Sequence, residues 1–468
     1  MKSILLLCLS LGSALSLAAE RKPNIILVMP DDAGMGDYGC FGSPIIKTPS
    51  VDAFKKTAHT FTQFHVSPTC SPTRSALMTG NHEFKNGVTH TIHERERLTT
   101  GAITLPQILK SAGYTTGVFG KWHLGDEAEY QPEKRGFDEV YIHGAGGIGQ
   151  SYPGSCGDAP GNSNINPTLR HNGKFVKTEG YCTDLFFDQA ARWIDANRSA
   201  DKPFFAYITP NAPHTPHVLP EKYYAHHVAK VGKGVARFYG MIENIDANFG
   251  KLLAKLDEWK LAENTIVIYM TSDNGGTAGR QVFDAGLRGG KGTAWEGGTR
   301  APCLIRWPGV TKADTESSAL TAHIDIFPTL AEITGVEFKH RIDGRSLVPL
   351  LKDPNAAWPD RTLVTHLGRW NVGKPPEKFG VCSVRNSTHS LVREKNAWLL
   401  FDMRVDPGQK TDIAAAHPDI VKTMSAAYDQ WWKDIQPLLV NEDAHKTAPK
   451  VNPYKELYRK QFGDSANL

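Results

Sequence analysis

Residues 24–32, Asn-Ile-Ile-Leu-Val-Met-Pro-Asp-Asp, decide the fold class of this chain. The run from Asn24 to Met29 is apolar and rich in β-branched side chains, which is typical of a strand buried on both faces of a parallel sheet. Asp31 and Asp32 follow directly after Pro30. Adjacent carboxylates repel each other unless a cation or several hydrogen-bond donors lie between them. The pair therefore indicates a cation site or a solvated turn, and these two residues alone favour the turn.

Further segments downstream have the composition of buried strands, with helical patterns between them. Strands are predicted at Tyr114–Phe119, Phe204–Ile208, Thr265–Met270 and Cys303–Trp307, and helices at Leu105–Ala112, Val235–Trp259 and His323–Thr334. This alternation predicts an α/β fold, in which crossover helices cover both faces of a mostly parallel sheet.

Polar residues follow the carboxyl ends of the first four predicted strands. These residues are Asp31-Asp32, Lys121-Trp122-His123, Asn211-Ala212-Pro213-His214 and Ser272-Asp273-Asn274. In open α/β sheets, ligands bind beyond the carboxyl ends of the strands. Because independent surface turns would have no reason to coincide in this way, the joint arrangement favours a cation and anion site over solvated turns.

A second decisive stretch is Cys70-Ser71-Pro72-Thr73-Arg74. Pro72 suits the first turn of a helix, Ser71 is a candidate N-cap and Gly80 a candidate C-terminal residue. Cys70 is therefore expected just before a helix N-terminus, where unpaired N–H groups and Arg74 attract an anion. The same surroundings lower a thiol pKa, so a reactive cysteine or a merely buried one is the alternative.

The pentapeptide resembles the Cys-x-Pro-x-Arg signature of the type I sulfatases, in which the cysteine is oxidised to Cα-formylglycine. The order of the motifs is similar too: Asp-Asp, Cys-Ser-Pro-Thr-Arg, Gly-Lys-Trp-His-Leu-Gly, Pro-His, Ser-Asp-Asn-Gly and a lysine in a Gly-rich loop. The resemblance runs from about Asn24 to Gly309 and continues weakly to Asp406-Pro407-Gly408. It implies an alkaline-phosphatase-like fold, with a mostly parallel sheet sandwiched by helices.

The resemblance also implies a metal and a nucleophile. It assigns one Ca²⁺ to Asp31, Asp32, Asp273 and Asn274 together with the modified Cys70. Carboxylate and amide oxygens suit Ca²⁺ or Mg²⁺ better than Zn²⁺. A formylglycine-generating maturation enzyme is then a required partner, and the hydrated aldehyde presents two hydroxyls, one of which attacks sulfur while the alcohol departs.

Roles for the remaining residues follow from the same resemblance. Arg74 and Lys121 orient the formylglycine and the sulfate, and Lys291 contacts sulfate. His214 gives a proton to the leaving oxygen, and His123 removes one from the remaining hydroxyl so that the aldehyde re-forms. Taken singly, each lysine is more often a solvated surface residue and each histidine a structural one.

Composition and the N-terminus limit the function classes. The 468-residue chain has a formal net charge of +4 and no run of basic residues, which argues against nucleic-acid binding. Residues 1–19 have a charged start, an apolar centre and a small-residue cleavage site, as in a secretory signal peptide. We therefore expect export to the periplasm or beyond, with no membrane attachment after cleavage.

The rest of the chain is predicted to form a catalytic domain over residues 20–357 and a smaller α+β module with an antiparallel sheet over 358–468. Tyr141–Tyr181 is rich in Gly, Pro, Asn and Ser, and it is interpreted as a substrate-facing rim or a disordered insertion. Cys156 and Cys182 flank part of this stretch and are the one candidate disulfide in an exported protein.

Two alternatives to a sulfatase stay open. A phosphomonoester or phosphodiester hydrolase of the same fold would have Ser or Thr as nucleophile and a second metal site. A non-catalytic protein that binds sulfated glycans would keep Cys70 as a thiol. For a sulfatase, export and the long rim favour sulfated carbohydrate as substrate, with simple aryl sulfates as artificial substrates.

Overall fold

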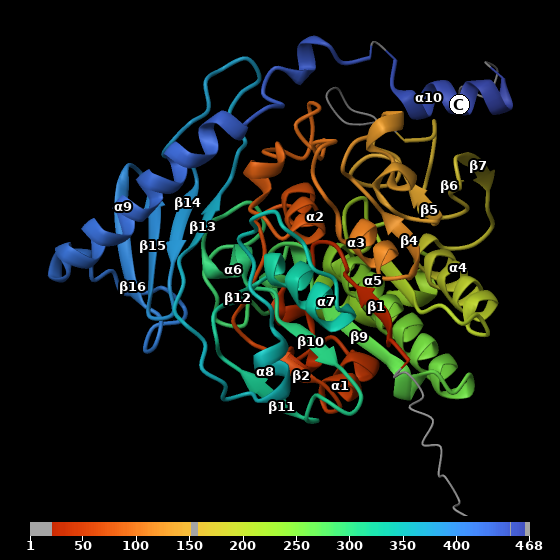
Figure 1. Cartoon of the computed structure of the whole chain (residues 1–468), viewed down its shortest axis with the longest axis horizontal. Helices are drawn as coiled ribbons and strands as arrows, with labels where there is room; N and C mark the ends of the chain where they lie inside the picture. Colours follow the sequence, from red (N-terminus) through yellow and green to blue (C-terminus); the bar gives the residue numbers. More distant parts are fainter. Residues whose placement is uncertain (1–20, 151–157, 450, 464–468) are drawn as a thin grey trace, which may run out of the picture.

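The computed structural model describes residues 21–150, 158–449 and 451–463 (Figure 1). A large sheet forms its centre, and ten strands belong to it in this part of the chain. In spatial order they are β11 (Thr315–Ser317), β2 (His59–Phe61), β10 (Cys303–Arg306), β9 (Thr265–Met270), β1 (Asn24–Val28), β8 (Phe204–Thr209), β4 (Thr115–Lys121), β5 (Glu139–His143), β6 (Thr168–His171) and β7 (Lys174–Lys177). The predicted mostly parallel sheet is confirmed.

The middle of this sheet is parallel. Strands β9, β1, β8, β4 and β5 are neighbours in that order and all run the same way, with Ile26 of β1 between Ala206 of β8 and Val267 of β9. The last predicted strand, β10, runs antiparallel to β9 and β2. The carboxyl ends of β9, β1, β8 and β4 therefore lie side by side at one edge.

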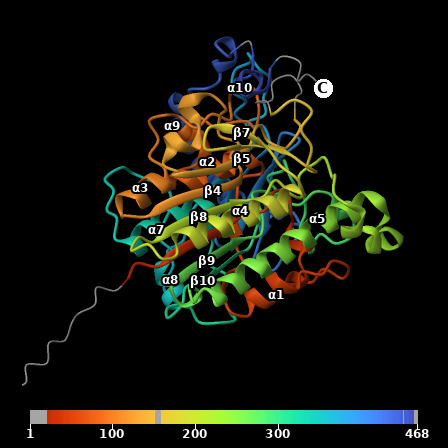
Figure 2. The ribbon, with the colours of Figure 1, turned by 90° about the vertical axis from the view of Figure 1, so that its right-hand side faces the viewer.

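Alternate residues of β1 contribute to two separate cores, which explains its uninterrupted apolar sequence. Ile26 and Val28 belong to the core on one face of the sheet, and Ile25 and Leu27 to the core on the other. The first face is covered by α1 (Pro49–Lys55), α4 (Cys182–Asn197) and α5 (Ala225–Glu258), and the second by α2 (Cys70–Thr79), α3 (Leu105–Ser111), α7 (Ile326–Thr334) and α8 (Val348–Lys352). Figure 2 shows α5 as the longest of these helices.

A second sheet of four antiparallel strands lies at the left of Figure 1. It consists of β13 (Leu363–His366), β14 (Cys382–Arg385), β15 (His389–Glu394) and β16 (Ala397–Asp402). Helix α9 (Pro418–Ile435) covers it and contributes Met424, Tyr428 and Trp432 to a core of its own. This is the small C-terminal antiparallel sheet that the sequence predicts, whereas the boundary at residue 358 stays a prediction.

The stretch from Tyr141 to Tyr181 is more regular than predicted. It includes the end of β5 and the antiparallel strands β6 and β7, which extend the main sheet. Phe175 of β7 packs against Tyr454 and Tyr458 of α10 (Pro453–Phe462), so the C-terminal tail is docked on this edge. The apolar alternation of β6 and β7 is too short to stand out among the surrounding Gly and Asn residues.

Other short elements include α6 (Glu296–Thr299) and a two-stranded parallel pair of β3 (Phe64–His65) and β12 (Thr321–Ala322). Cys182 is a free thiol buried at the start of α4, so the predicted disulfide is not supported; Cys156 lies outside the described residues.

The predicted signal peptide also lies outside the described residues. Within the described ranges, no helix combines the length and apolar character needed to cross a membrane.

Candidate functional site

The acidic residues predicted at the ends of β1 and β9 lie together in the structure. The backbone N–H of Asp32 lies 3.4 Å from Oδ1 of Asp273, and the amide of Asn274 donates to Oδ1 of Asp32 at 2.9 Å. All four side chains of this group, including Asp31, are buried. The two strands are neighbours in the sheet, and for this reason residues about 240 positions apart in the sequence share one site.

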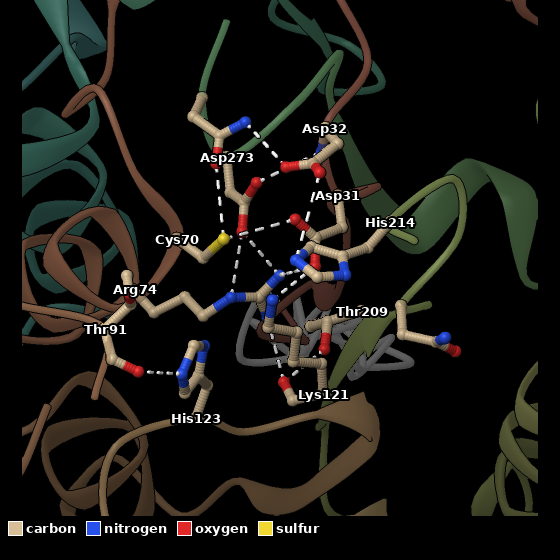
Figure 3. A network of polar contacts seen from close by, with 12 residues as sticks. Asp31, Asp32, Cys70, Arg74, Thr91, Lys121, His123, Thr209, His214 and Asp273 are labelled. Carbon is tan, nitrogen blue, oxygen red and sulfur yellow. Dashed lines mark hydrogen bonds and ion pairs between the residues drawn. The ribbon is translucent and has the colours of Figure 1, made fainter. Parts of the chain in front are cut away.

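Cys70 lies at the centre of this acidic group (Figure 3). Its Sγ is 3.4 Å from Oδ1 of Asp31 and 3.3 Å from Oδ1 of Asn274. It is the first residue of α2, with Thr69 as N-cap and Gly80 as left-handed C-cap. Ser71 is therefore not the cap, because the helix begins two residues earlier than predicted, at Cys70 itself, and Ser71 lies within the helix.

Three cationic side chains surround the carboxylates. Arg74, one turn into α2, donates from Nε and Nη2 to Oδ2 of Asp273 at 3.0 and 2.7 Å. Lys121 at the end of β4 pairs with Oδ2 of Asp31. Lys291 reaches Oδ1 of Asp32 at 2.6 Å and lies 3.6 Å from Sγ of Cys70. The two lysines thus come from distant parts of the chain and pair with the two adjacent carboxylates Asp31 and Asp32.

These charges set the protonation states. Burial, reinforced by the carboxylate of Asp31, raises the pKa of the Cys70 thiol to about 12. For Asp32, burial opposes ionisation, but the charges of Lys291, His214 and Lys121 hold the pKa of the carboxyl well below its usual range. Burial and the carboxylate of Asp31 therefore act against the alternative of a reactive, low-pKa cysteine at the unmodified residue.

His214 and His123 flank the cluster in different states of hydrogen bonding. His214, on the loop after β8, has Nε2 3.9 Å from Oδ2 of Asp32 and Nδ1 2.7 Å from the carbonyl of Thr215. Burial lowers its pKa to about 4, against the opposing charge of Asp32. Nε2 of His123 is 2.8 Å from the carbonyl of Thr91, and its buried Nδ1 has no hydrogen-bond partner among the described residues.

Backbone strain accompanies two of these residues. Asp32 has φ 63° and His123 has φ 60°. Both values lie in the left-handed region of the backbone, which residues other than glycine rarely adopt. Such conformations persist only where the surroundings impose them, and they concentrate at functional sites.

The loop that follows β5 lies within the stretch Tyr141–Tyr181, which is interpreted from the sequence as a substrate-facing rim, but none of its residues is singled out from the sequence. A Cβ on Gly146 would lie 2.5 Å from Cε1 of His123, and a Cβ on Gly147 would lie 3.1 Å from Nδ1 of His214. The neighbouring His143 is buried, with an Nε2 that lacks a partner in the described chain. The adjacent glycines just past a buried strand are the signal that identifies this loop, because its backbone passes against both histidines.

The donor set fits a hard divalent cation. One ligand atom from each of Asp31, Asp32, Cys70 and Asp273 lies within 4.8 Å of the others, and Asn274 adds an amide oxygen beside Cys70. The carboxylate and amide oxygens suit Ca²⁺ or Mg²⁺. The structure therefore brings together all ten residues singled out from the sequence: Asp31, Asp32, Cys70, Arg74, Lys121, His123, His214, Asp273, Asn274 and Lys291.

Comparison with known proteins identifies the family. Residues 23–336 match the Sulfatase family model, and residues 290–432 match the model described as N-sulphoglucosamine sulphohydrolase, C-terminal. The chain belongs to the sulfatase family. It is a sulfuric ester hydrolase with the alkaline-phosphatase-like fold of that family.

Individual relatives agree with this assignment. The sulfatase is 30% identical to N-acetylgalactosamine-6-sulfatase of Rattus norvegicus, over 87% of this chain and 84% of that protein. It is also 30% identical to arylsulfatase A of Homo sapiens, over 89% of each chain. The crystal structure of Ps i-CgsB in complex with k-i-k-neocarrahexaose has a TM-score of 0.79 and 28% identity, covering 94% of this chain and 100% of that one.

Proposed function

We propose that this sulfatase hydrolyses sulfate esters of carbohydrates outside the cytoplasm, with Cα-formylglycine formed from Cys70 and with one Ca²⁺. The observation that carries the proposal is the position of Cys70, whose Sγ lies among oxygens of Asp31 and Asn274 and beside Lys291. A buried thiol with a pKa of about 12 is a poor nucleophile. Oxidation to the hydrated aldehyde would supply a hydroxyl nucleophile at the same point.

The cation would be held by Asp31, Asp32, Asp273, Asn274 and the modified Cys70. When bound, it would withdraw charge from the sulfate oxygens and from the nucleophile. Lys121 and Lys291 contact its carboxylate ligands and carry fixed positive charge into the same pocket.

The protein's own residues bind and orient the sulfate. Arg74 is held rigidly by Asp273 and by the carbonyl of Lys121 at 2.9 Å, so its charge stays fixed at the helix N-terminus. Lys291 pairs with Asp32, and its side chain is 20% exposed, so its charge is accessible to an incoming sulfate. Preorganised cations of this kind stabilise charge that develops on the oxygens in the transition state.

The two histidines would transfer protons in opposite directions. With Nε2–H of His123 donated to Thr91, its free Nδ1 is a proton acceptor, which suits removal of a proton from the remaining hydroxyl. His214 donates Nδ1–H to Thr215 and needs a second proton on Nε2 to act as an acid. The negative charge of bound sulfate raises the pKa of a nearby imidazole and favours that protonation.

The substrate class rests on the relatives and on export. N-acetylgalactosamine-6-sulfatase is named for a sulfated sugar, and Ps i-CgsB was crystallised with neocarrahexaose. Together with the signal-like residues 1–19, this supports a sulfated glycan in the periplasm or outside the cell, and aryl sulfates as artificial substrates.

Peptide mass spectrometry of the mature protein tests the proposal first. The enzyme is co-expressed with a formylglycine-generating enzyme, and the tryptic peptide Thr57–Arg74 is measured. We expect the aldehyde or its hydrate at Cys70, hydrolysis of 4-nitrophenyl sulfate, and loss of that activity on calcium removal with recovery on its return. A thiol at Cys70 in active enzyme would contradict the mechanism.

A panel of defined sulfated mono- and oligosaccharides tests the substrate class. Release of sulfate from at least one saccharide is expected at a higher kcat/KM than from the aryl sulfate. Activity confined to aryl sulfates would count against carbohydrate, and faster hydrolysis of 4-nitrophenyl phosphate would favour a phosphate ester instead.

A further inference from the structure

A second group of metal-ligating side chains lies on α5 and shares no residue with the candidate active site. Nε2 of His226 is 2.9 Å from Oε2 of Glu243, and Nε2 of His227 is 2.9 Å from Oε1 of the same carboxylate. One ligand atom from each of the three residues lies within 4.8 Å of the other two. The three side chains thus converge on a single point.

This convergence depends on a break in α5. On a straight helix, His227 and Glu243 would be separated by about 24 Å, because each residue advances the helix by about 1.5 Å. Gly232 has φ 73° and ψ 161°, which is not helical, and it divides α5 into a short first part and a long second part. Figure 2 shows the short first part turned away from the line of the long one. The chain reversal brings the histidines back onto Glu243.

The three ligands are prepositioned and open to solvent on one side. The side chain of His227 is 3% exposed and that of Glu243 is 18% exposed, whereas that of His226 is 57% exposed. The backbone N–H of Lys47 donates to Oε1 of Glu243 at 3.1 Å, which orients the carboxylate from outside the group. An ion can therefore enter past His226 and meet two ligands that are already fixed.

We propose that His226, His227 and Glu243 bind a zinc ion that clamps the two parts of α5 together. Two imidazole nitrogens with one carboxylate are a zinc set, whereas the oxygen-rich group beside Cys70 suits calcium. Zinc bonds of about 2.0–2.2 Å require each imidazole nitrogen to move only a few tenths of an ångström from the carboxylate oxygen that it now contacts at 2.9 Å. The proton on each Nε2 moves to Nδ1, the rings stay neutral, and water completes the coordination.

The clamp stabilises a segment that leads out of the active site. The chain runs from His214 through a short 3₁₀ turn at Glu221–Tyr223 directly into the first part of α5. A zinc ion bound to Glu243 would fix the far end of this segment to the long part of α5, which packs on the sheet. The inference is independent of the reaction proposed for Cys70.

Zinc titration of the full mature chain tests the site. The titration uses a chromophoric competitor, with excess Ca²⁺ present throughout. We expect wild type to bind one equivalent of zinc. The zinc affinity should fall at least tenfold in Glu243→Gln and in His226→Gln, and it should keep its wild-type value in His417→Gln. His417 is an exposed histidine at the start of α9 and serves as the matched control. Hydrogen exchange of residues 225–231 is expected to slow with zinc in wild type and in His417→Gln, but not in Glu243→Gln or His226→Gln.

His226→Gln keeps the test decisive if Glu243→Gln does not fold, because His226 is mostly exposed. Unchanged zinc affinity in this variant would overturn the proposal. A different result is that the variant loses zinc binding while zinc leaves the hydrogen exchange of residues 225–231 in wild type unchanged. That result would confirm the zinc site but overturn its role as a clamp.

Discussion

At the scale of single residues, the thiol of Cys70 shows burial outweighing local positive charge. A helix N-terminus and Arg74 favour a thiolate, and Lys121 and Lys291 add to this effect. Burial and the carboxylate of Asp31 act in the opposite direction and raise the pKa to about 12. The unmodified thiol is thus unsuited to attack, which agrees with a site built for a different nucleophile.

The first prediction concerns this residue. Cys70→Ser should lose multiple turnover of 4-nitrophenyl sulfate by about 10³-fold or more, because a serine cannot release sulfate by re-forming an aldehyde. The melting temperature should stay within a few degrees of the wild-type value, since serine fits the same space. Cys40→Ser, a half-buried cysteine away from the site, should keep full activity. Sustained turnover by Cys70→Ser would refute the mechanism.

At the scale of elements, the backbone of the loop after β5 passes close against both histidines. Gly146→Ala places a Cβ within 2.5 Å of His123, so the imidazole must move. We predict a fall in kcat of about tenfold or more with little change in the melting temperature, because displacing a group by about 1 Å can cost 10²-fold in rate. Steady-state kinetics on 4-nitrophenyl sulfate measure the effect.

Gly101→Ala is the matched control for this loop. A Cβ on Gly101 meets nothing within 4 Å, and its backbone is not in the left-handed region. It should have wild-type kcat. Equal losses in both variants would show that the Gly146 contact has no specific role.

The break in α5 permits a second prediction at this scale. Gly232 and Gly234 both have open space for a Cβ, but only Gly232 has a positive φ, of 73°. Gly232→Ala should lower the free energy of unfolding by about 1–2 kcal/mol, and Gly234→Ala should raise it by about 0.5–1 kcal/mol. Urea unfolding of the two variants measures the difference, and equal effects would contradict the argument.

At the scale of the whole molecule, the C-terminal sheet supports the loop that carries Lys291. Arg385 of β14 donates to Glu296 of α6 at 3.1 Å, and Trp295 packs on Phe401 of β16. Both Glu296 and Trp295 are buried. The smaller sheet therefore contributes to the candidate active site through contacts with this loop, although it supplies none of the ten residues.

Global stability should depend on pH through Asp37. Burial raises the pKa of this carboxyl to about 7, despite a hydrogen bond from the N–H of Gly34 at 2.7 Å. The folded protein therefore holds a proton that the unfolded chain releases near pH 4, so this contribution to stability is present at low pH and is lost as the pH rises towards 7.

Asp37→Asn isolates this contribution, because the amide resembles the protonated carboxyl at every pH. As the pH rises from 5 to 8, the free energy of unfolding of the variant should increase relative to that of wild type by roughly 2–3 kcal/mol. Urea unfolding across that range gives the difference. A difference that does not change with pH would show that Asp37 is ionised throughout in the folded protein.

The sequence by itself determined the parallel centre of the sheet and the composition of the site. Continuous β-branched runs such as Asn24–Met29 specify buried strands locally, and the residues that follow them must meet at one edge. The resemblance to the sulfatase family was also readable from the sequence, because it rests on the spacing within the motif around Cys70 and on the order of the other motifs along the chain.

Tertiary structure alone decided how those residues pair. Lys121 contacts Asp31 and Lys291 contacts Asp32 across more than 80 residues, and no local pattern records such partners. The same holds for the antiparallel direction of β10 and for the chain reversal at Gly232 that brings His227 to Glu243. Periodicity reports which face of an element is buried, whereas long-range pairing depends on which elements the folded core places side by side.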